Sequence, residues 1–511
     1  MRFSTFLIAS FTLASVHAQV TLDPAFGTDG VVSAALDPGY DGAYAMALQA
    51  DGKVLITGPS GVNGDLDALV ARFNADGSMD TSFGTDGVAT FDINGDDYTF
   101  AIAVQDDGKI LLAGSTKTGS NTDMLVLRVN TEGSLDTDFG VAGTVTLDGG
   151  SANDKVNAMV VRPDDHVVIG GTGTTSGFSC FYLAQLNDDG TLDTSFGTDG
   201  VVKHLVSADN SQLNALALMN DGRIVAAGNS KEVSTMNDFA VCRYMTDGTF
   251  DSTFNGTGKV VIAASTANDN ANGVAVQSDG SIVIGGVENS TSSSAAIVTL
   301  TRLLEAGTLD STFGTAGLSH LFVGGAPTRA AQVLIQPNGA IIACGTASPV
   351  ANERDSYLCR VTAEGMPDAT FGVNGEQRYG ALDLYRETPC MALQPDGKII
   401  VGGIDAGGGV VNTLLLRYGA DGTTAISEQA NQAGRIDIRS VRPDGISFVL
   451  SDAASEVALI DTDGRMLQRF SGRFSSGDNT VRFAKVMPTG AYLLRATTTN
   501  GVVIARFAVV R

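Results

Sequence analysis

The chain has 511 residues, no tryptophan, 62 glycines and a net charge of −24 from 32 basic and 56 acidic side chains. A surface of that sign repels phosphate backbones, which argues against a nucleic-acid partner and against a purely electrostatic membrane anchor. Abundant glycine combined with short apolar runs favours many short strands joined by tight turns.

The first 18 residues predict an export signal. Arg2 precedes an apolar run over residues 3–16, and Val16-His17-Ala18 places small or moderate residues before a cleavage point. We place the start of the mature chain at Gln19. The run is too short for a comfortable membrane span and no other segment is as long. The sequence therefore predicts an exported protein, secreted or at the cell surface, with no transmembrane span.

A motif typified by Leu192-Asp193-Thr194-Ser195-Phe196-Gly197 recurs along the chain. Successive copies of its phenylalanine are 57, 56, 57, 58, 59 and 58 residues apart. A nearly fixed period of this size indicates a repeat architecture. The motif aspartates and phenylalanines are Asp23 and Phe26, Asp80 and Phe83, Asp136 and Phe139, Asp193 and Phe196, Asp251 and Phe254, Asp310 and Phe313, and Asp368 and Phe371.

Each repeat contains four apolar runs of strand length, as the first repeat illustrates. Residues 31–36 follow the motif, residues 43–49 and 53–57 flank an Asp-Gly turn, and residues 68–73 precede the next motif. We expect the Asp-Gly turn to be a two-residue hairpin with positive φ at both central residues. The fourth run carries an arginine in six repeats and Gln185 in the other.

Seven repeats of four strands predict an all-β, seven-bladed β-propeller with four-stranded blades over residues 19–422. A linear solenoid is the alternative, but its coils are usually shorter and it needs atypical end repeats, which this sequence does not show. The sequence leaves open which strand is innermost and whether the first run closes the seventh blade.

The LDxxFGxxG motif, followed in register by QxDGK, resembles the delta-60 repeat, a β-propeller repeat common in bacterial surface proteins. The resemblance covers residues 22–422, with single departures at Asn255, Asp165-His166 and Met366-Pro367-Asp368. It implies a propeller fold and no defined activity.

The motif side chains have a structural and a functional interpretation. We expect each phenylalanine to fill the gap between two blades, since burying it contributes about 1.5–3 kcal/mol. We expect the motif aspartates to accept backbone N–H groups or to pair with the fourth-run arginine. We favour this structural role over cation binding, because a feature present in every blade usually stabilises the blade itself. The calcium-like stretch 187–193 is rejected because Met245 and Leu304 replace its first residue in other copies. The sequence therefore predicts no metal and no cofactor.

The five cysteines, Cys180, Cys242, Cys344, Cys359 and Cys390, show no metal-ligand spacing. We interpret them as small buried hydrophobes. A disulfide between Cys344 and Cys359, on neighbouring strands of one repeat, is the alternative that an oxidising compartment permits.

Loops that differ between repeats predict where a ligand binds. Because strands alternate in direction, the nearly invariant Asp-Gly and motif turns lie on one face of the disc. The loops between runs one and two and between runs three and four lie on the other. We expect any ligand to meet this second face; ordinary solvated loops are the alternative. The candidate binding residues are Tyr40, Asp41, Asp97, Tyr98, Asp154 and Arg329.

The sequence contains few catalytic signals. His166 lies in a predicted hairpin turn, and His204 and His320 follow the first run of two different repeats. No GxSxG, HExxH, P-loop or CxxC motif occurs. We therefore predict a non-catalytic binding or adhesion propeller whose partner is an extracellular glycan or a surface protein. A glycan-active hydrolase or lyase with acids in the central channel is the alternative, and a structural surface component is a third.

The repeat ends after Gly422. Residues 423–434 predict a polar linker, and the short alternating strands of residues 435–511 predict a small Ig-like β-sandwich. Residues 461–465, 490–494 and 507–511 resemble the C-terminal sorting domain of type IX secretion cargo, although the usual Pro-Asn-Pro opening is missing. The resemblance implies a partner in the outer-membrane secretion machinery and later removal of the domain; an Ig-like binding module is the alternative.

Overall fold

The computed structural model describes residues 22–36, 39–62, 65–150, 153–231, 236–288, 297–321, 328–347, 354–379, 385–407, 410–419, 436–442, 445–450, 453–461, 466–483, 490–498 and 501–509. The expected signal peptide (1–18) and linker (423–434) lie outside these residues. The chain divides into two compact units, Met1–Thr423 and Thr424–Arg511. Strands and their connections account for the described residues, and no helix among them is long and apolar enough to cross a membrane.

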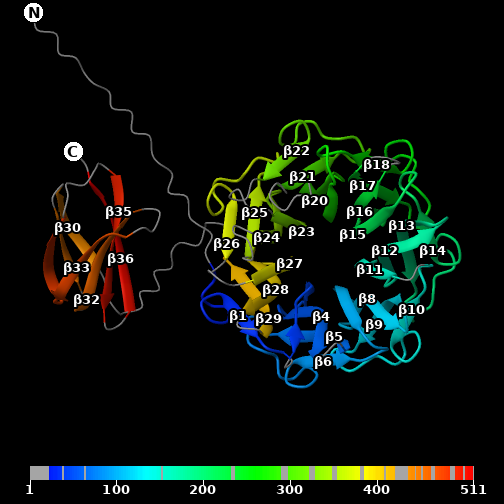
Figure 1. The fold of residues 1–511 in the computed structure, drawn as a ribbon, viewed down its shortest axis with the longest axis horizontal. Helices are drawn as coiled ribbons and strands as arrows, with labels where there is room; N and C mark the ends of the chain where they lie inside the picture. Colours follow the sequence, from blue (N-terminus) through cyan, green and yellow to red (C-terminus); the bar gives the residue numbers. More distant parts are fainter. Residues whose placement is uncertain are drawn as a thin grey trace, which may run out of the picture. The chain divides into compact units, whose positions relative to one another are not determined.

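Seven four-stranded blades surround a central opening in the first unit (Figure 1). The innermost strands contact one another around a closed ring. From blade one to blade seven they are β3 (Ala45–Leu48), β7 (Asp97–Val104), β11 (Lys155–Val161), β15 (Ser211–Leu218), β19 (Asn270–Val276), β23 (Thr328–Ile335) and β27 (Tyr385–Leu393). The second run of each repeat is therefore the innermost strand, which the sequence left open.

The remaining strands follow outward by antiparallel pairing. The second strands are β4 (Val54–Val62), β8 (Ile110–Thr118), β12 (Val167–Thr175), β16 (Ile224–Lys231), β20 (Ile282–Glu288), β24 (Ile341–Ala347) and β28 (Ile399–Gly407). The third strands are β5 (Asp65–Phe73), β9 (Asn121–Val129), β13 (Phe178–Leu186), β17 (Asn237–Tyr244), β21 (Ile297–Leu303), β25 (Asp355–Val361) and β29 (Val410–Tyr418). The outermost strands are β6 (Val88–Phe91), β10 (Thr144–Leu147), β14 (Val201–His204), β18 (Lys259–Ile262), β22 (Leu318–Leu321), β26 (Glu376–Tyr379) and, in blade seven, β1 (Val31–Ala34).

The first strand of the chain closes the ring. β1 pairs antiparallel with β29, so the outermost strand of blade seven comes from the first repeat. The short strand β2 (Tyr40–Asp41) also pairs with both β4 and β29 and joins blades one and seven. Closure of this kind leaves no unpaired repeat at either end of the array.

An arginine on the third strand of six blades, buried in five of them and partly buried at Arg302, binds a copy of the motif. In blade one, Arg72 Nε donates to Asp80 Oδ2 at 2.7 Å, and the guanidinium carbon lies 4.5 Å from the ring centroid of Phe83. Arg72 Nη1 also donates to the Thr131 carbonyl of the next blade at 2.7 Å. We call this arrangement of arginine, motif aspartate and motif phenylalanine the clamp; it recurs at Arg128, Arg243, Arg302, Arg360 and Arg417.

The motif side chains are satisfied within the protein. All seven motif phenylalanines are fully buried, and Phe83 packs with apolar residues of both blade one and blade two. Asp80 Oδ1 accepts the Ser82 N–H at 3.2 Å and the Ser82 hydroxyl at 2.6 Å. The Ser82 hydroxyl contributes most, with Lys53 and Arg72 adding to it, to holding the pKa of Asp80 well below its ordinary value.

Blade three keeps the clamp although its third strand lacks the arginine. Gln185 Nε2 donates to Asp193 Oδ2 at 2.6 Å, and Arg162 from the inner-strand hairpin donates to Gln185 Oε1 at 2.8 Å and to the Thr246 carbonyl at 2.9 Å. In blade six the two residues have the reverse places: Arg360 is on the third strand and donates to Oε1 of Gln336, which follows the inner strand, at 3.3 Å. The glutamine and arginine have exchanged strands while the guanidinium remains between the blades.

The Asp-Gly turns differ from the prediction. In the first turn Gly52 has φ of +85°, while Asp51 is absent from the residues with positive φ. The N–H groups of Gln49 and Gly52 donate to Lys53 and Gln49 carbonyls, both at 2.9 Å, which defines a three-residue loop. A type I turn followed by a left-handed glycine has this form, so one residue with positive φ is sufficient. In the odd copy Asp165 occupies the glycine position with φ of +64°.

The five cysteines are buried and free, which confirms their interpretation as small hydrophobes and shows that the alternative disulfide is wrong. Cys344 pairs with Leu358 and Cys359 with Ala343, so the two cysteines are one position out of register. Successive residues of a strand point to opposite faces. Cys344 accordingly packs in the cluster shared with blade seven and Cys359 in the cluster shared with blade five.

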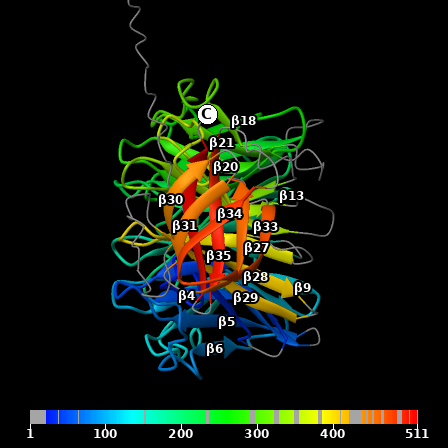
Figure 2. The same cartoon turned by 90° about the vertical axis from the view of Figure 1, so that its left-hand side faces the viewer.

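The second unit contains two antiparallel sheets (Figure 2, orange to red). One sheet consists of β30 (Ile436–Arg442), β31 (Gly445–Leu450) and β34 (Gly477–Arg482). The other consists of β33 (Met466–Phe474), β32 (Ala454–Asp461), β35 (Gly490–Thr498) and β36 (Gly501–Val509). Residues from both sheets, including Phe448, Leu459 and Leu494, form one hydrophobic cluster. The immunoglobulin-like topology of this unit stays a prediction.

The exchange of arginine and glutamine predicts that a second substitution restores the stability lost through the first. Arg360→Gln is expected to lower the free energy of unfolding by about 2 kcal/mol, because the charge-assisted hydrogen bond to Asp368 is lost. Adding Gln336→Arg copies blade three and is expected to recover most of the loss. Urea unfolding measures both effects, and a double variant no more stable than the single variant would contradict the exchange.

The buried thiols predict low reactivity. Burial raises the pKa of Cys180 to about 11 and that of Cys242 to about 12, so both stay protonated at neutral pH. We expect no rapid reaction of the native protein with a thiol reagent at pH 8. All five cysteines should react after unfolding in urea without reductant; three reactive thiols under those conditions would reveal a disulfide.

Candidate functional site

Antiparallel pairing separates the connections of the propeller into two sets. The Asp-Gly and motif turns lie at one end of the strands. At the other end lie the loops that link an outer strand to the next inner strand and a second strand to a third; we call this end the variable face. For blade two these loops are residues 92–96 and 119–120. Variable loops on a rigid frame are common binding sites.

All six candidate residues lie where the chain enters an inner strand from the variable face. Tyr40 and Asp41 form β2, Asp97 and Tyr98 begin β7, Asp154 precedes β11, and Arg329 lies in β23. The backbone of Arg329 pairs with Thr346, while its side chain lies outside the described part of the structure. The fold therefore brings the candidates from four blades to one end of the inner ring.

The three candidate aspartates are fully buried. Asp41 Oδ2 accepts the Leu36 N–H at 2.6 Å, and Asp97 Oδ2 accepts the Ile93 N–H at 2.7 Å. These bonds shape the loop that precedes each inner strand. A ligand resting on the variable face does not contact these carboxylates directly, whereas the tyrosine after Asp97 is partly exposed.

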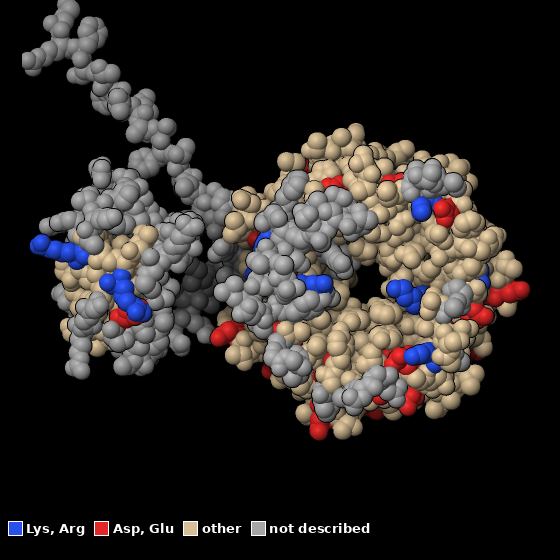
Figure 3. All heavy atoms as spheres, viewed as in Figure 1, with Lys and Arg blue, Asp and Glu red and all other residues tan. Residues whose placement is uncertain are grey.

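Five consecutive inner strands carry a β-bulge at the same register position, at Phe100, Asn157, Asn214, Asn272 and Ala331. A bulge bends its strand and re-aims one side chain. Asn157 Nδ2 donates to the Leu213 carbonyl at 2.6 Å, and Asn214 Nδ2 donates to the Ala271 carbonyl at 2.8 Å. These two asparagines thus tie β11 to β15 and β15 to β19 beside the central opening, which Figure 3 shows in space-filling form.

Aromatic side chains gather at this level of blades one and two. The Tyr44 and Phe100 rings stack with centroids 6.0 Å apart and an interplanar angle of 15°, and Tyr98 stacks on Phe100 at 6.0 Å and 4°. The hydroxyls of Tyr40 and Tyr44 lie 2.6 Å apart. All four residues are half-buried. We call Tyr40, Tyr44, Tyr98 and Phe100 the aromatic row.

Polar side chains occupy the equivalent positions on the inner strands of the blades that follow the aromatic row. Lys155, Gln212 and Asn270 occupy the register position of Tyr98 in the next three blades. Lys155 Nζ lies 5.5 Å from the Phe100 centroid, and desolvation lowers the pKa of this ammonium group. For Tyr98, burial raises the phenol pKa and the nearby Asp96 carboxylate adds to the effect. The site therefore offers apolar ring faces next to ammonium, amide and hydroxyl groups.

The histidines do not belong to this site. His166 lies in a hairpin turn 3.2 Å from Asp164, His204 stacks on Phe250 on the outermost strand of blade three, and His320 lies 3.0 Å from Glu288. No histidine of the described residues is on an inner strand, so none is positioned as a general base in the central channel.

Sequence reasoning found Tyr40 and Tyr98 but missed Tyr44, Phe100 and Lys155. The available signal was the period-two pair Tyr98 and Phe100 at the start of a predicted strand, with a tyrosine in the corresponding segment of the preceding repeat. The bulge that brings Phe100 beside Tyr44 has no comparable signal.

Three solved structures of low similarity cover most of the chain. PorZ, described as an essential bacterial surface component of the type-IX secretion system of Porphyromonas gingivalis, is 12% identical with a TM-score of 0.40, over 94% of this chain and 61% of that chain. The polysaccharide lyase Uly1 is 12% identical with a TM-score of 0.41, over 80% and 94%. Chaetomium thermophilum Sqt1 bound to the N-terminus of ribosomal protein L10 is 13% identical with a TM-score of 0.40, over 75% and 98%. No curated protein sequence matches the chain.

A protein-family model matches each of the seven repeats. The model is described as a β-propeller domain of unknown function (DUF5122), and it matches residues 49–83, 105–139, 162–196, 220–254, 277–313, 336–371 and 394–424. Each matched stretch runs from the Asp-Gly turn region to the motif or the end of the last repeat, so the match covers segments that repeat in every blade and leaves out the aromatic row. The chain is a repeat β-propeller protein.

Proposed function

We propose that the propeller is an extracellular binding module that recognises an extended glycan on the variable face. The aromatic row is the observation that carries this proposal. Aromatic side chains make up 6% of the chain, and four of them gather at one end of two adjacent inner strands. Half-buried rings provide flat apolar surfaces for the C–H faces of sugars, and the phenol hydroxyls provide hydrogen bonds at their edges.

The polar groups near the aromatic row would orient a bound glycan. Lys155 and Gln212 are exposed beside the row, and the Asn229 amide donates to Asn270 Oδ1 at 2.7 Å on the same face. A few placed polar groups around apolar surface are typical of a specific ligand site. Because bulged asparagines and clamps fix the inner strands, the site is largely formed before the ligand arrives, which reduces the entropy cost of binding.

Glycan cleavage remains the second candidate, and it is distinguished by its product. The three candidate aspartates are buried, whereas the Asp96 carboxylate near Tyr98 and the exposed Asp92 carboxylate are acids at the same end of the inner strands. A cleaving site needs a proton donor and acceptor that contact the sugar. Release of reducing or unsaturated sugars from a bound polysaccharide would replace the binding proposal by a hydrolase or lyase.

We also propose that the chain is exported and displayed at the bacterial surface. The apolar N-terminal segment with Arg2 supports entry into the export pathway. The resemblance of residues 435–511 to a sorting domain supports a second step through the outer-membrane secretion machinery. The partition into two compact units is compatible with removal of the second after transport.

The aromatic row predicts the effect of substitutions on binding. On a glycan array that identifies a ligand for the mature chain, Tyr98→Ala is expected to weaken binding at least tenfold, about 1.4 kcal/mol, through loss of one stacking surface. Phe178→Ala is the matched control, since Phe178 is an exposed aromatic residue on β13 outside the row. Equal affinity of the Tyr98 variant and the parent, or an equal loss in the control, would contradict the proposal.

The export proposal predicts a change of location. Removing residues 435–511 is expected to leave the propeller folded and trapped in the periplasm of its native host. Fractionation and immunoblotting of the culture measure this. Unchanged appearance of the truncated chain at the cell surface or in the medium would exclude the sorting role.

A further inference from the structure

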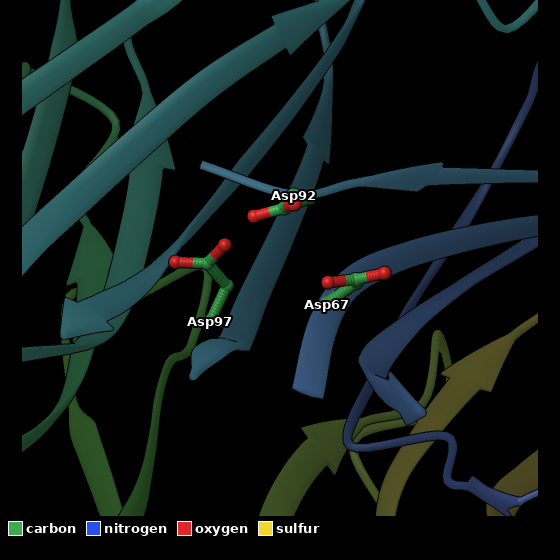
Figure 4. A group of neighbouring side chains, drawn as sticks. All are labelled: Asp67, Asp92 and Asp97. Atoms are coloured by element: carbon green, nitrogen blue, oxygen red, sulfur yellow. The ribbon is translucent and has the colours of Figure 1, made fainter. Parts of the chain in front are cut away.

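Three carboxylates from separate segments meet where blade one contacts blade two. Asp67 lies on β5, Asp92 follows β6, and Asp97 begins β7. One oxygen from each lies within 4.8 Å of the others, and Figure 4 shows the three side chains converging on a common space. The group joins the third and fourth strands of one blade to the inner strand of the next.

The same arrangement recurs one blade later. Asp123 on β9, Asp148 after β10 and Asp154 before β11 also bring one oxygen each within 4.8 Å of the others. Asp67 pairs with Ser60, and Asp123 pairs with the corresponding Thr116, so the two groups are in register. We call them the first triad and the second triad.

One oxygen of the first triad is buried without a protein partner. Asp97 is fully buried, its Oδ2 accepts the Ile93 N–H, and its Oδ1 has no hydrogen bond with any described residue. The Thr116 hydroxyl, opposite Asp97 in the strand pairing, is a nearby donor to this carboxylate, but the two groups form no hydrogen bond of normal geometry. A buried carboxylate oxygen in this state needs a ligand or costs stability.

Blade five provides an internal comparison. Asp269 occupies the position of Asp97, but Ala263 follows the outer strand where Asp92 stands in the first triad. There Asp269 Oδ1 accepts the Ser265 hydroxyl at 2.6 Å, and Oδ2 accepts the Ser265 N–H at 2.8 Å. In blade five, where the neighbouring acid is missing, the protein itself satisfies both carboxylate oxygens of this aspartate.

Electrostatics favour a cation in the first triad. Three carboxylates close together in a chain of net charge −24 repel one another, and a bound cation removes the repulsion. The ligand atoms are all hard carboxylate oxygens, which suit calcium or magnesium rather than transition metals.

We propose that the first and second triads bind one divalent cation each, and that calcium fits them best. Calcium binds oxygens at about 2.3–2.6 Å, so two ligands on opposite sides of the ion are about 4.8 Å apart, which is the limit of the observed spacing. Each ion would join two neighbouring blades beside the aromatic row, next to Tyr98 at the first triad. The proposal is independent of what the row binds.

The two sites are expected to differ in affinity. Lys203 Nζ donates to the Gly149 carbonyl at 2.8 Å, directly beside Asp148 of the second triad. A fixed positive charge there opposes cation binding. The first triad should therefore bind the tighter of the two ions.

Terbium luminescence tests the proposal on the full mature chain. The chain has no tryptophan, so emission sensitised by protein reports tyrosines near the ion, and Tyr98 follows Asp97 directly. We expect saturable emission with two terbium ions bound per chain and displacement by calcium at far lower concentration than by magnesium. Asp92→Asn should weaken the first site roughly tenfold or more and Asp148→Asn the second, since affinity depends on ligand charge.

Asp86→Asn is the matched control. Asp86 is an exposed aspartate in the motif turn before β6, at the end of that strand opposite Asp92, and asparagine tolerates its φ of +52°. Circular dichroism checks that each variant is folded, and calorimetric titration with calcium chloride repeats the count without a luminescent probe. Absence of saturable binding, or two sites of unchanged affinity in the Asp92 and Asp148 variants, would overturn the proposal. Equal displacement by magnesium would overturn the assignment of calcium.

Discussion

The clamp between an arginine, a motif aspartate and a motif phenylalanine is the contact on which the propeller depends. A guanidinium buried between two blades is tolerable because the aspartate accepts a hydrogen bond from it, the ring covers its face, and a carbonyl of the next blade accepts another N–H group. Blade three shows that the requirement is for the charge at that place, since Arg162 supplies it from a different strand. Closure by β1 extends the same contact from Arg417 to Asp23 across the ends of the repeat array.

Because of the clamp, the face with the motif and Asp-Gly turns and the variable face have different roles. The motif and Asp-Gly turns are occupied in holding blades together, so their residues are fixed by packing and hydrogen bonding. At the opposite ends of the inner strands the described residues differ more from blade to blade, as Tyr98, Lys155 and Gln212 at one register position show. Buried aspartates and bulged asparagines fix the conformation of this face. The aromatic row and Lys155 lie on that fixed frame, at the ends of the inner strands. Rigid support with variable side chains suits recognition of a ligand.

Much of the fold could be predicted from sequence because the period, the turn glycines and the motif are local signals repeated seven times. The family model independently matches the seven repeats. The turn type was predicted wrongly, since Asp51 and Gly52 do not reveal that the loop has three residues. The triads were missed for another reason: Asp67, Asp92 and Asp97 belong to three segments that register and blade contact bring together. The stacking of Tyr44 on Phe100 likewise depends on a bulge and on the neighbouring blade.

The central claim is that one face builds the propeller and the other binds its ligand. Hydrogen–deuterium exchange of the mature chain, with and without a bound oligosaccharide, tests it most directly. A functional variable face predicts slower exchange over residues 40–48, 92–104 and 155–161 and unchanged exchange in motif turns such as residues 80–87. Protection confined to the motif and Asp-Gly turns would contradict the division of the two faces.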